Sequence, residues 1–485
     1  MLIRFQILLL AWAVLTQTVR GDPVEVWNNA LLDSIRTENT HPCLAARAFA
    51  VVHGAMYDAC AAITGRGRAF YASESVGGNL PLAFALNSAA FSTATNLFPS
   101  RTATFREVYS NQLKTLPDDP LRGAAIRLGR NIAEAWIIWR TSDGSSGTLP
   151  YIPSTQPGAW RRTPPFLRPP EMQNWARVIP FTLVSAAQFR PSGPPSLGSG
   201  QYAEEVNLVK KLGGATSSDR TAEQTEIARF WSDFSYTVTP PGHWNQIAQA
   251  VAVRRQMTIE DKVRLFAVLN ITLSDVGVSC WESKYFYNFW RPVTAIRAAD
   301  NDSNPATEKD VNWMPLLNTP AFPEYISGHS AFSGAAAAVL VKFNGGDEIE
   351  FSVQSDSLPG KIRSYRSLLK CAAEVSQSRL YGGIHFPSAL KDGLELGRQI
   401  AEHVMSNLFL SEDLKSSPKV VISPGELNRG LWLGLTTYPG QLVTLERQAS
   451  TGEWKPWTNA VASSSTTRWA LSPGGESSRF RATLQ

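Results

Sequence analysis

The chain has 485 residues, of which 43% are hydrophobic and 18% are charged, as in an ordinary globular protein. Its length exceeds that of one typical core, so we expect one large unit and an accessory module. The formal net charge of +5 is small for this length, and no basic tract or nucleic-acid motif occurs, which argues against a nucleic-acid-binding function.

The first 21 residues have the features of a secretory signal peptide. They combine Arg4, an apolar run over residues 5–16 and the small-residue ending Val19-Arg20-Gly21. The run is too short to span a bilayer comfortably, and no later stretch has the roughly eighteen uninterrupted apolar residues of a membrane span. We therefore expect export to the periplasm or the extracellular space and no membrane embedding, with an N-terminal anchor as the alternative.

Helical patterns fill residues 24–140. One of them, residues 42–63, carries Cys43, His53 and Cys60. A helix would hold the two thiols roughly 25 Å apart, too far for a disulfide. Because the chain has no CxxC or Cys/His metal spacing, we expect buried free thiols. His53 is interpreted as a hydrogen-bonded core residue.

Residues 150–195 carry 11 of the 31 prolines. This stretch is too long for a turn, and its Trp160, Phe166 and Trp175 argue against disorder. We expect an ordered, extended segment that wraps over the helices and can rim a binding site.

The next pattern, one long helix or two in tandem over residues 258–290, leads into the first of three stretches with anion-binding character. There Lys284 and Arg291 are seven residues apart, which in a helix would place them on one face, roughly 10 Å from each other.

The second stretch, residues 322–332, contains Ser327-Gly328-His329 before a predicted helix over residues 329–343. Ser327 is a good N-cap, and Gly328 lets the backbone approach a ligand. The free N–H groups and the dipole at such a helix start favour an anion. His329 stands where a proton donor or acceptor would be useful, although a simple cap is the alternative.

In the third stretch, a predicted helix over residues 361–380 ends near Arg379, and His385 precedes another helix over 387–409. Together the three stretches supply three cations, a hydroxyl, a glycine N–H and two histidines, with no obvious carboxylate. That set suits a tetrahedral oxyanion better than a divalent metal ion.

Helix follows helix without βαβ alternation, so the fold class is predicted as mainly α, a multi-helix bundle over residues 22–410. After a linker over residues 411–419, short alternating segments separated by Pro-Gly and Ser-Thr-Gly turns predict a small β-sandwich-like module over 420–485. The module contains no histidine or cysteine, and we interpret it as a spacer, sorting element or adhesion surface.

The spacing of these motifs resembles the signature of the vanadium-dependent haloperoxidase and type 2 phosphatidic acid phosphatase superfamily. The matching elements are Lys284 followed after six residues by Arg291-Pro292, then Ser327-Gly328-His329, and then Ser378-Arg379 followed after five residues by His385. Trp281 and Phe322 are similar to aromatic residues of the soluble, chloroperoxidase-like branch. Ile326 stands where the family usually has proline, and Ala389 where it usually has aspartate.

The resemblance implies a haloperoxidase-like helical fold and a vanadate cofactor. Hydrogen peroxide and halide would be the substrates and hypohalous acid the product. The implied vanadate-binding residues are Lys284, Arg291, Ser327, Gly328, Arg379 and His385, with His385 as the nitrogen ligand of vanadium. It also implies that Lys284 polarises peroxide, that His329 is the acid–base and that Trp281 and Phe322 lie beside the halide.

The same atoms would serve a soluble acid phosphatase that cleaves a phosphate monoester through a phosphohistidine at His385. A non-catalytic relative is a third possibility. Chain length, Trp281, Phe322 and the proline-rich segment favour the haloperoxidase. The preferred halide and the oligomeric state do not follow from the sequence.

Overall fold

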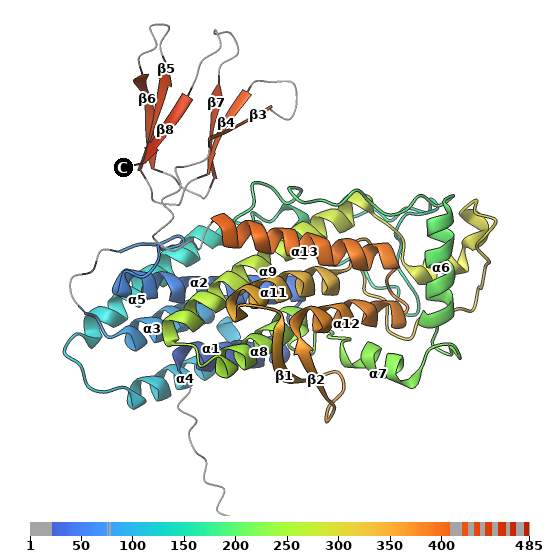
Figure 1. Ribbon diagram of the computed structural model, residues 1–485, viewed down its shortest axis with the longest axis horizontal. Coiled ribbons are helices and arrows are strands. Elements are labelled where there is room, and N and C mark those ends of the chain that lie inside the picture. Colours follow the sequence, from blue (N-terminus) through green and yellow to red (C-terminus); the bar gives the residue numbers. More distant parts are fainter. Residues whose placement is uncertain are drawn as a thin grey trace, which may run out of the picture.

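The structure of the protein is a computed structural model that describes residues 22–407, apart from residues 75, 77 and 78, and six strands between residues 420 and 484 (Figure 1). The predicted signal peptide over residues 1–21 and the predicted linker over 411–419 lie outside the described residues.

Within that part of the chain there are thirteen α-helices, which confirms the mainly α fold class. They are α1 (Pro23–Thr37), α2 (Pro42–Thr64), α3 (Leu82–Leu97), α4 (Thr102–Thr115), α5 (Arg122–Thr141), α6 (Gly200–Gly213), α7 (Ala222–Phe230), α8 (Thr239–Arg254), α9 (Ile259–Tyr287), α10 (Pro292–Arg297), α11 (Gly328–Asn344), α12 (Leu368–Tyr381) and α13 (Pro387–Asn407).

The bundle is built around α9, which packs against α2 and α11 (Figure 1). Thr258 caps its first turn by accepting the N–H of Asp261, and the acidic side chains of Glu260 and Asp261 suit the positive end of the helix dipole. By length and composition α9 would be able to cross a membrane, but 94% of its most apolar window is buried inside the fold. It is therefore the core helix of the bundle.

Helices α11 and α13 touch backbone to backbone because glycines face the contact. A β-carbon at Gly334 would lie 2.2 Å from the carbonyl oxygen of Leu394, and one at Gly397 would lie 2.1 Å from that of Ala331. Such a substitution would force the helices apart. The close packing brings together the starts of both helices, and these starts carry Ser327 and His385.

Two sequence-based expectations about these elements are wrong. The first concerns Lys284 and Arg291, which do not share a helix face, because α9 ends at Tyr287. Asn288 adopts a left-handed conformation (φ 50°) as the C-cap, a position that asparagine tolerates. Arg291 is extended, as expected for a residue before proline, and precedes α10.

The second concerns the helix predicted over residues 361–380, which begins only at Leu368. Residues before it form β2 (Ile362–Ser367), which pairs antiparallel with β1 (Glu348–Gln354). In both strands burial alternates from residue to residue, with Ile349, Phe351 and Val353 of β1 turned inward. This period of two is that of a strand, and it overrides the helical interpretation.

The proline-rich segment is ordered, as predicted, and Asp275 of α9 anchors it. The Asp275 carboxylate accepts the backbone N–H groups of Phe181 (2.6 Å) and Thr182 (2.8 Å) as well as the Thr182 hydroxyl. Trp160 and Trp175 of the segment are fully buried. The segment is therefore part of the folded body rather than a loose connection.

The four cysteines are buried and free, as expected, and α2 contains both Cys43 and Cys60. His53 is a buried core residue whose Nε2 lies 3.1 Å from Asn28 Oδ1, which confirms the interpretation made from the sequence.

Burial lowers the pKa of His53 to about 3. The unfolded chain, with an ordinary histidine pKa near 6.5, therefore binds a proton in the window between about 3 and 6.5 that the folded chain does not. We expect the free energy of unfolding to fall by up to about 1.4 kcal/mol for each pH unit below 6.5 on account of this residue. Urea unfolding between pH 7.5 and 5 should show a shallower pH dependence in His53→Gln, and an unchanged slope would contradict the assignment.

The C-terminal residues form two antiparallel sheets with strand orders β3-β4-β7 and β6-β5-β8. The strands are β3 (Val420–Pro424), β4 (Leu431–Thr436), β5 (Leu442–Gln448), β6 (Trp454–Val461), β7 (Thr466–Leu471) and β8 (Phe480–Leu484). A small β module was predicted here, and the boundary over residues 411–419 stays a prediction.

A chain truncated after Glu412 should keep the Tm of the helical bundle within about 3 °C and keep its ligand binding. The reason is that the residues from Val24 to Val404 bury a large hydrophobic core of their own, and the β module contains no histidine or cysteine for the site. Thermal unfolding followed by circular dichroism, with the full chain as control, tests this. A folded truncated chain that had lost ligand binding would show that the β module completes the site.

Candidate active site

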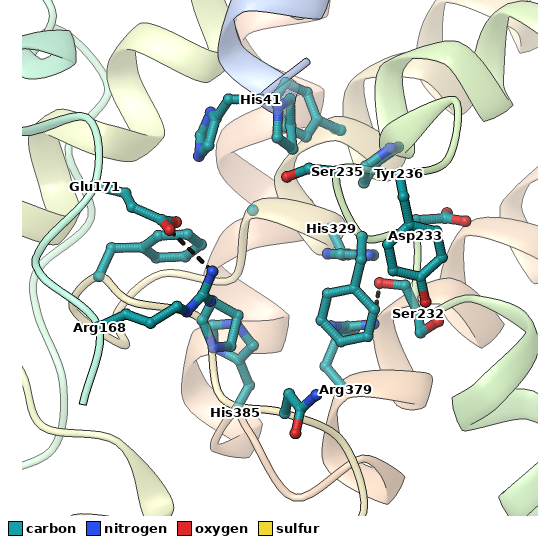
Figure 2. Close-up of a pocket in the computed structure, with 18 of the residues that line it drawn as sticks. His41, Arg168, Glu171, Ser232, Asp233, Ser235, Tyr236, His329, Arg379 and His385 are labelled. Carbon is teal, nitrogen blue, oxygen red and sulfur yellow. Dashed lines mark hydrogen bonds and ion pairs between the residues drawn. The ribbon is translucent and has the colours of Figure 1, made fainter. Parts of the chain in front are cut away.

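A cavity of about 460 Å³ opens where the three motif stretches meet (Figure 2). Six residues selected from the sequence line it: Trp281, Phe322, Gly328, His329, Arg379 and His385. The other three, Lys284, Arg291 and Ser327, are fully buried and pack directly against this wall. The fold thus gathers all nine around one site.

His385 is held in one tautomer by two neighbours. Its Nδ1 lies 2.8 Å from Glu324 Oε1, and its Nε2 lies 3.1 Å from Arg291 Nη1. A guanidinium only donates, so Nε2 is the acceptor and the proton of the neutral ring is on Nδ1. Burial and the Arg291 charge lower the pKa of His385 well below its usual range. The ring therefore keeps a lone pair on Nε2, the atom that a ligand needs.

The sequence analysis was wrong to expect no carboxylate at the site, because Glu324 lies beside His385. Glu324 is fully buried, and its Oε1 also accepts the N–H of Phe386 at 2.9 Å. Burial raises its pKa to about 8, against the lowering effect of the Arg291 charge. Whether or not Oε2 carries a proton, Oε1 remains an acceptor for His385 Nδ1–H and fixes the orientation of the ring.

Two buried guanidinium groups keep donors without a protein partner. Arg291 donates from Nε to the Phe322 carbonyl and from Nη1 to the Ile384 carbonyl, both at 2.9 Å, but its Nη2 has no partner. Arg379 donates from Nη1 to the Trp231 carbonyl at 2.8 Å, but its Nε has none. Burial lowers the pKa of Arg291 to about 10 and that of Arg379 to about 9, so both stay charged at neutral pH.

A buried cationic donor without a protein partner needs a compensating water, ion or ligand. Here the two donors are cationic, they belong to two different segments of the chain, and they accompany His385 Nε2, which accepts only from Arg291 among the described residues. A tetrahedral oxyanion such as vanadate fits this donor set, because charged N–H groups bind its oxygens and the imidazole offers a nitrogen ligand.

Lys284 has a different environment from the two arginines. Its ammonium donates to three backbone carbonyls, those of Pro323 (3.2 Å), Glu324 (3.1 Å) and Ile326. An ammonium has three N–H donors, so all of them are used. Burial lowers the pKa of Lys284 to about 8. In this structure the side chain holds the turn that carries Glu324 rather than reaching into the cavity.

The start of α11 is built as the sequence predicts. Ser327 is the N-cap and accepts the N–H of Ser330 at 3.3 Å. A β-carbon at Gly328 would lie 3.5 Å from the Trp281 ring, so the helix start packs directly on that ring. The two positions that differ from the usual family pattern act here through their backbones: the Ile326 carbonyl accepts from Lys284, and the Ala389 carbonyl accepts the Ser327 N–H at 3.1 Å.

His329 lies on the same side of the cavity as Asp233 and Arg379 (Figure 2). Its Nε2 has no hydrogen-bond partner, and burial together with the Arg379 charge lowers its pKa well below 6.5. Asp233, which the sequence analysis missed, is buried and lies 3.2 Å from His243 Nδ1. Its negative charge partly offsets the positive charge of Arg379.

His41 is a second missed residue. Its Nδ1 accepts the N–H of Cys43 at 3.2 Å, so in the neutral ring Nε2 carries the proton, and this N–H has no partner. Burial and the Arg168 charge lower the pKa of His41 to about 3, which keeps it neutral. The ring stands edge-on to Trp281 at 5.2 Å, and Trp281 lies 4.9 Å from Phe322. In the sequence, His41-Pro42 indicates only a helix start.

Comparison with known proteins agrees with this geometry. The family model described as the VCPO second helical-bundle domain matches residues 264–410, which include all three motif stretches. The vanadium chloroperoxidase of Curvularia inaequalis is 31% identical over 182 residues, which are 32% of this chain and 29% of that protein. The chain thus aligns with less than a third of the length of that curated relative.

Two solved structures are similar over most of the chain. A bacterial vanadium-dependent iodoperoxidase has a TM-score of 0.69 and 27% identity, and the match covers 79% of this chain and 95% of the other. A bacterial vanadium-dependent chloroperoxidase in its holo form has a TM-score of 0.60 and 17% identity, with 80% and 92% covered, and it supports the fold alone. The fold, the motifs and these matches together support placing the chain in the vanadium haloperoxidase superfamily.

Proposed function

We propose that the protein is an exported vanadate-dependent haloperoxidase that uses hydrogen peroxide to oxidise halide to hypohalous acid. The observation that carries the proposal is the pair of unpaired cationic donors, Arg291 Nη2 and Arg379 Nε, on side chains that lie beside His385: Arg379 lines the same cavity as His385, and Arg291 packs against its wall. Bound vanadate would supply the electrophilic activation of peroxide.

The residues that would hold this anion are called the cradle: Arg291, Arg379, His385, Ser327 and Gly328. Arg291 and Arg379 neutralise its charge, and His385, oriented by Glu324, offers the nitrogen ligand. The start of α11 adds the Ser327 hydroxyl and the Gly328 N–H at the positive end of a helix dipole. Lys284 contributes in two ways. Its ammonium fixes the turn over residues 323–326, and its positive charge lies beside the aromatic wall, 5.1 Å from the Phe322 ring.

His329 is the group suited to handle protons. Its lowered pKa keeps the imidazole neutral at working pH, and its Nε2 has no protein partner. A neutral imidazole at the cavity surface can accept a proton from peroxide and return it to the departing oxygen.

The aromatic wall favours halide oxidation over ester cleavage. Trp281 and Phe322 form an apolar surface, beside which the neutral N–H of His41 and the Arg291 guanidinium lie, the latter 5.0 Å from the Phe322 ring. A halide loses hydration on reaching such a surface, and nearby donors and positive charge offset that loss. Export is proposed from the signal-like sequence of residues 1–21.

One preparation assayed in two ways tests the proposal. Monochlorodimedone halogenation is measured with vanadate, peroxide and bromide or chloride, and p-nitrophenyl phosphate hydrolysis is measured without vanadate. We expect halogenation that depends on vanadate and only slow ester cleavage. Fast ester cleavage that vanadate inhibits, without halogenation at any pH, would instead establish the phosphohistidine phosphatase, since vanadate and phosphate share one cradle.

A further inference from the structure

The cavity is larger than its proposed inorganic ligands require. A halide, a peroxide or a water molecule each needs a space on the order of 30 Å³, and a tetrahedral oxyanion needs a few times that volume. The cavity holds about 460 Å³, which lies in the range of pockets for small organic ligands, roughly 300–1,000 Å³. Space for an organic molecule therefore remains once the cradle is filled.

The outer wall of this space is aromatic and exposed. Phe166 of the proline-rich segment is 66% exposed and Tyr236 of the loop after α7 is 58% exposed, and both line the cavity. Phe234 lines it as well. Large aromatic side chains gathered at an opening are typical of a ligand-binding groove, because they stack on flat ligands.

The opening has two chemically different sides. Arg168 and Glu171 form an ion pair of 3.0 Å on one side, and Tyr236 lies with His329 and Asp233 on the other (Figure 2). A guanidinium at the rim can donate to a hydroxyl or phenolate oxygen. The rim thus combines stacking surfaces with one donor for a polar substituent.

This rim is fixed to the body of the protein. The Glu171 carbonyl accepts the Tyr285 hydroxyl at 2.6 Å, and the Glu171 N–H donates to the Ala321 carbonyl at 2.9 Å, next to Phe322. On the other side, the Asp233 N–H donates to the Ser357 hydroxyl at 3.1 Å and the Val238 N–H to the Asp356 carboxylate at 3.0 Å, which holds the loop that carries Tyr236. A preformed rim spares a ligand the entropic cost of ordering it.

We propose that the outer cavity binds an electron-rich phenol, stacked against Phe166 and Tyr236 with its hydroxyl toward Arg168, as the organic acceptor of the halogen. This inference rests on the proposed function, which generates hypohalous acid at the base of the same cavity, beside His329 and His385. A bound phenol intercepts that acid before it reaches bulk solvent.

The transfer is balanced. The ring carbon of the phenol attacks the halogen of hypohalous acid, so a carbon–halogen bond forms and the oxygen–halogen bond breaks. The ring carbon then loses its proton, and hydroxide and proton together give water. The carbon is oxidised at the expense of hydrogen peroxide, the oxidant consumed when the hypohalous acid was formed.

Binding is tested first, without peroxide, by calorimetric titration of the vanadate-loaded full chain with 2-naphthol. We expect Phe166→Ala and Tyr236→Ala each to weaken binding about tenfold, because each removes a stacking surface. Phe286→Ala is the matched control, since Phe286 is 58% exposed and does not line the cavity. Equal affinities in all three variants and the parent chain, or no binding to the parent, would overturn the inference.

Turnover is tested second, with phenol and bromide. We expect the bromination rate to saturate with phenol concentration. The ortho-to-para ratio of the bromophenols should differ from the ratio that reagent hypobromous acid gives, and it should return to the reagent ratio in Phe166→Ala and Tyr236→Ala. Formation of triiodide from iodide and peroxide needs no acceptor and should be unchanged in all variants. If triiodide forms but the bromination rate does not saturate with phenol and the ortho-to-para ratio equals that of reagent hypobromous acid, only the further inference is overturned. If no triiodide forms, the proposed function itself is overturned.

Discussion

His385→Ala should abolish saturable binding of orthovanadate, whereas His329→Ala should keep binding within about threefold and lose turnover. The difference follows from the two environments. His385 presents a fixed Nε2 lone pair between Glu324 and Arg291, and nothing else in the cradle replaces a nitrogen ligand. His329 lies at the cavity surface with a free Nε2, and its proposed task is to move protons. Calorimetric titration of the apoprotein with orthovanadate measures the first property, and the halogenation assay measures the second.

The control for both variants is His403→Ala, which removes a histidine from α13 that packs on Phe189, away from the cavity. It should change neither binding nor turnover. Equal retention of vanadate in His385→Ala and His329→Ala would reverse or discard the two roles, and absence of binding in the parent chain would discard the cofactor.

Glu324→Gln should weaken vanadate binding by about 10- to 100-fold, the usual effect of removing the outer partner of a metal-bound imidazole. Glutamine keeps an oxygen that can accept from His385 Nδ1 and from the Phe386 N–H, so the fold and the tautomer are retained. What is lost is the carboxyl group that makes Nε2 more basic. Glu324→Ala should weaken vanadate binding further, because the His385 ring also loses the contact that orients it.

The matched control is Glu205→Gln, a buried glutamate that accepts from the Ser388 hydroxyl and acts on Glu324 through its charge, with no hydrogen bond between these two described side chains. Titration of Glu324→Gln, Glu324→Ala and Glu205→Gln with orthovanadate at one pH compares their affinities for vanadate. If Glu324→Gln and Glu205→Gln bound vanadate as the parent does, the Glu324–His385 contact would be structural only.

The contact residues of the cradle were predictable because they lie at fixed spacings around helix ends. An N-cap serine, a glycine and a basic residue in a last turn are local signals, and Ser327, Gly328 and Arg379 lie where those signals place them. The long apolar pattern that became α9 was equally clear, since its periodicity extends over many turns.

Glu324 was not predictable for the opposite reason. It lies in a segment without periodicity, and its partner His385 is 61 residues away, so only tertiary packing joins them. His41 was hidden in the same way, because a histidine before proline indicates a cap and gives no hint of the Trp281 ring beside it. Arg291 lies outside α9 because Asn288 adopts a left-handed conformation and ends the helix. An argument from helical periodicity assumes that the helix continues and so does not predict this.

The proline-rich segment is held to the helices at several places, while some of its side chains face the opening of the cavity. Asp275 holds it through Phe181 and Thr182, whereas Phe166 and Arg168 reach the cavity mouth. Substitutions at exposed rim positions cost little stability, because the anchor and the core remain intact. Over evolutionary time, related enzymes can therefore exchange the mouth of the pocket, and with it the molecules admitted, while inheriting the anion cradle unchanged.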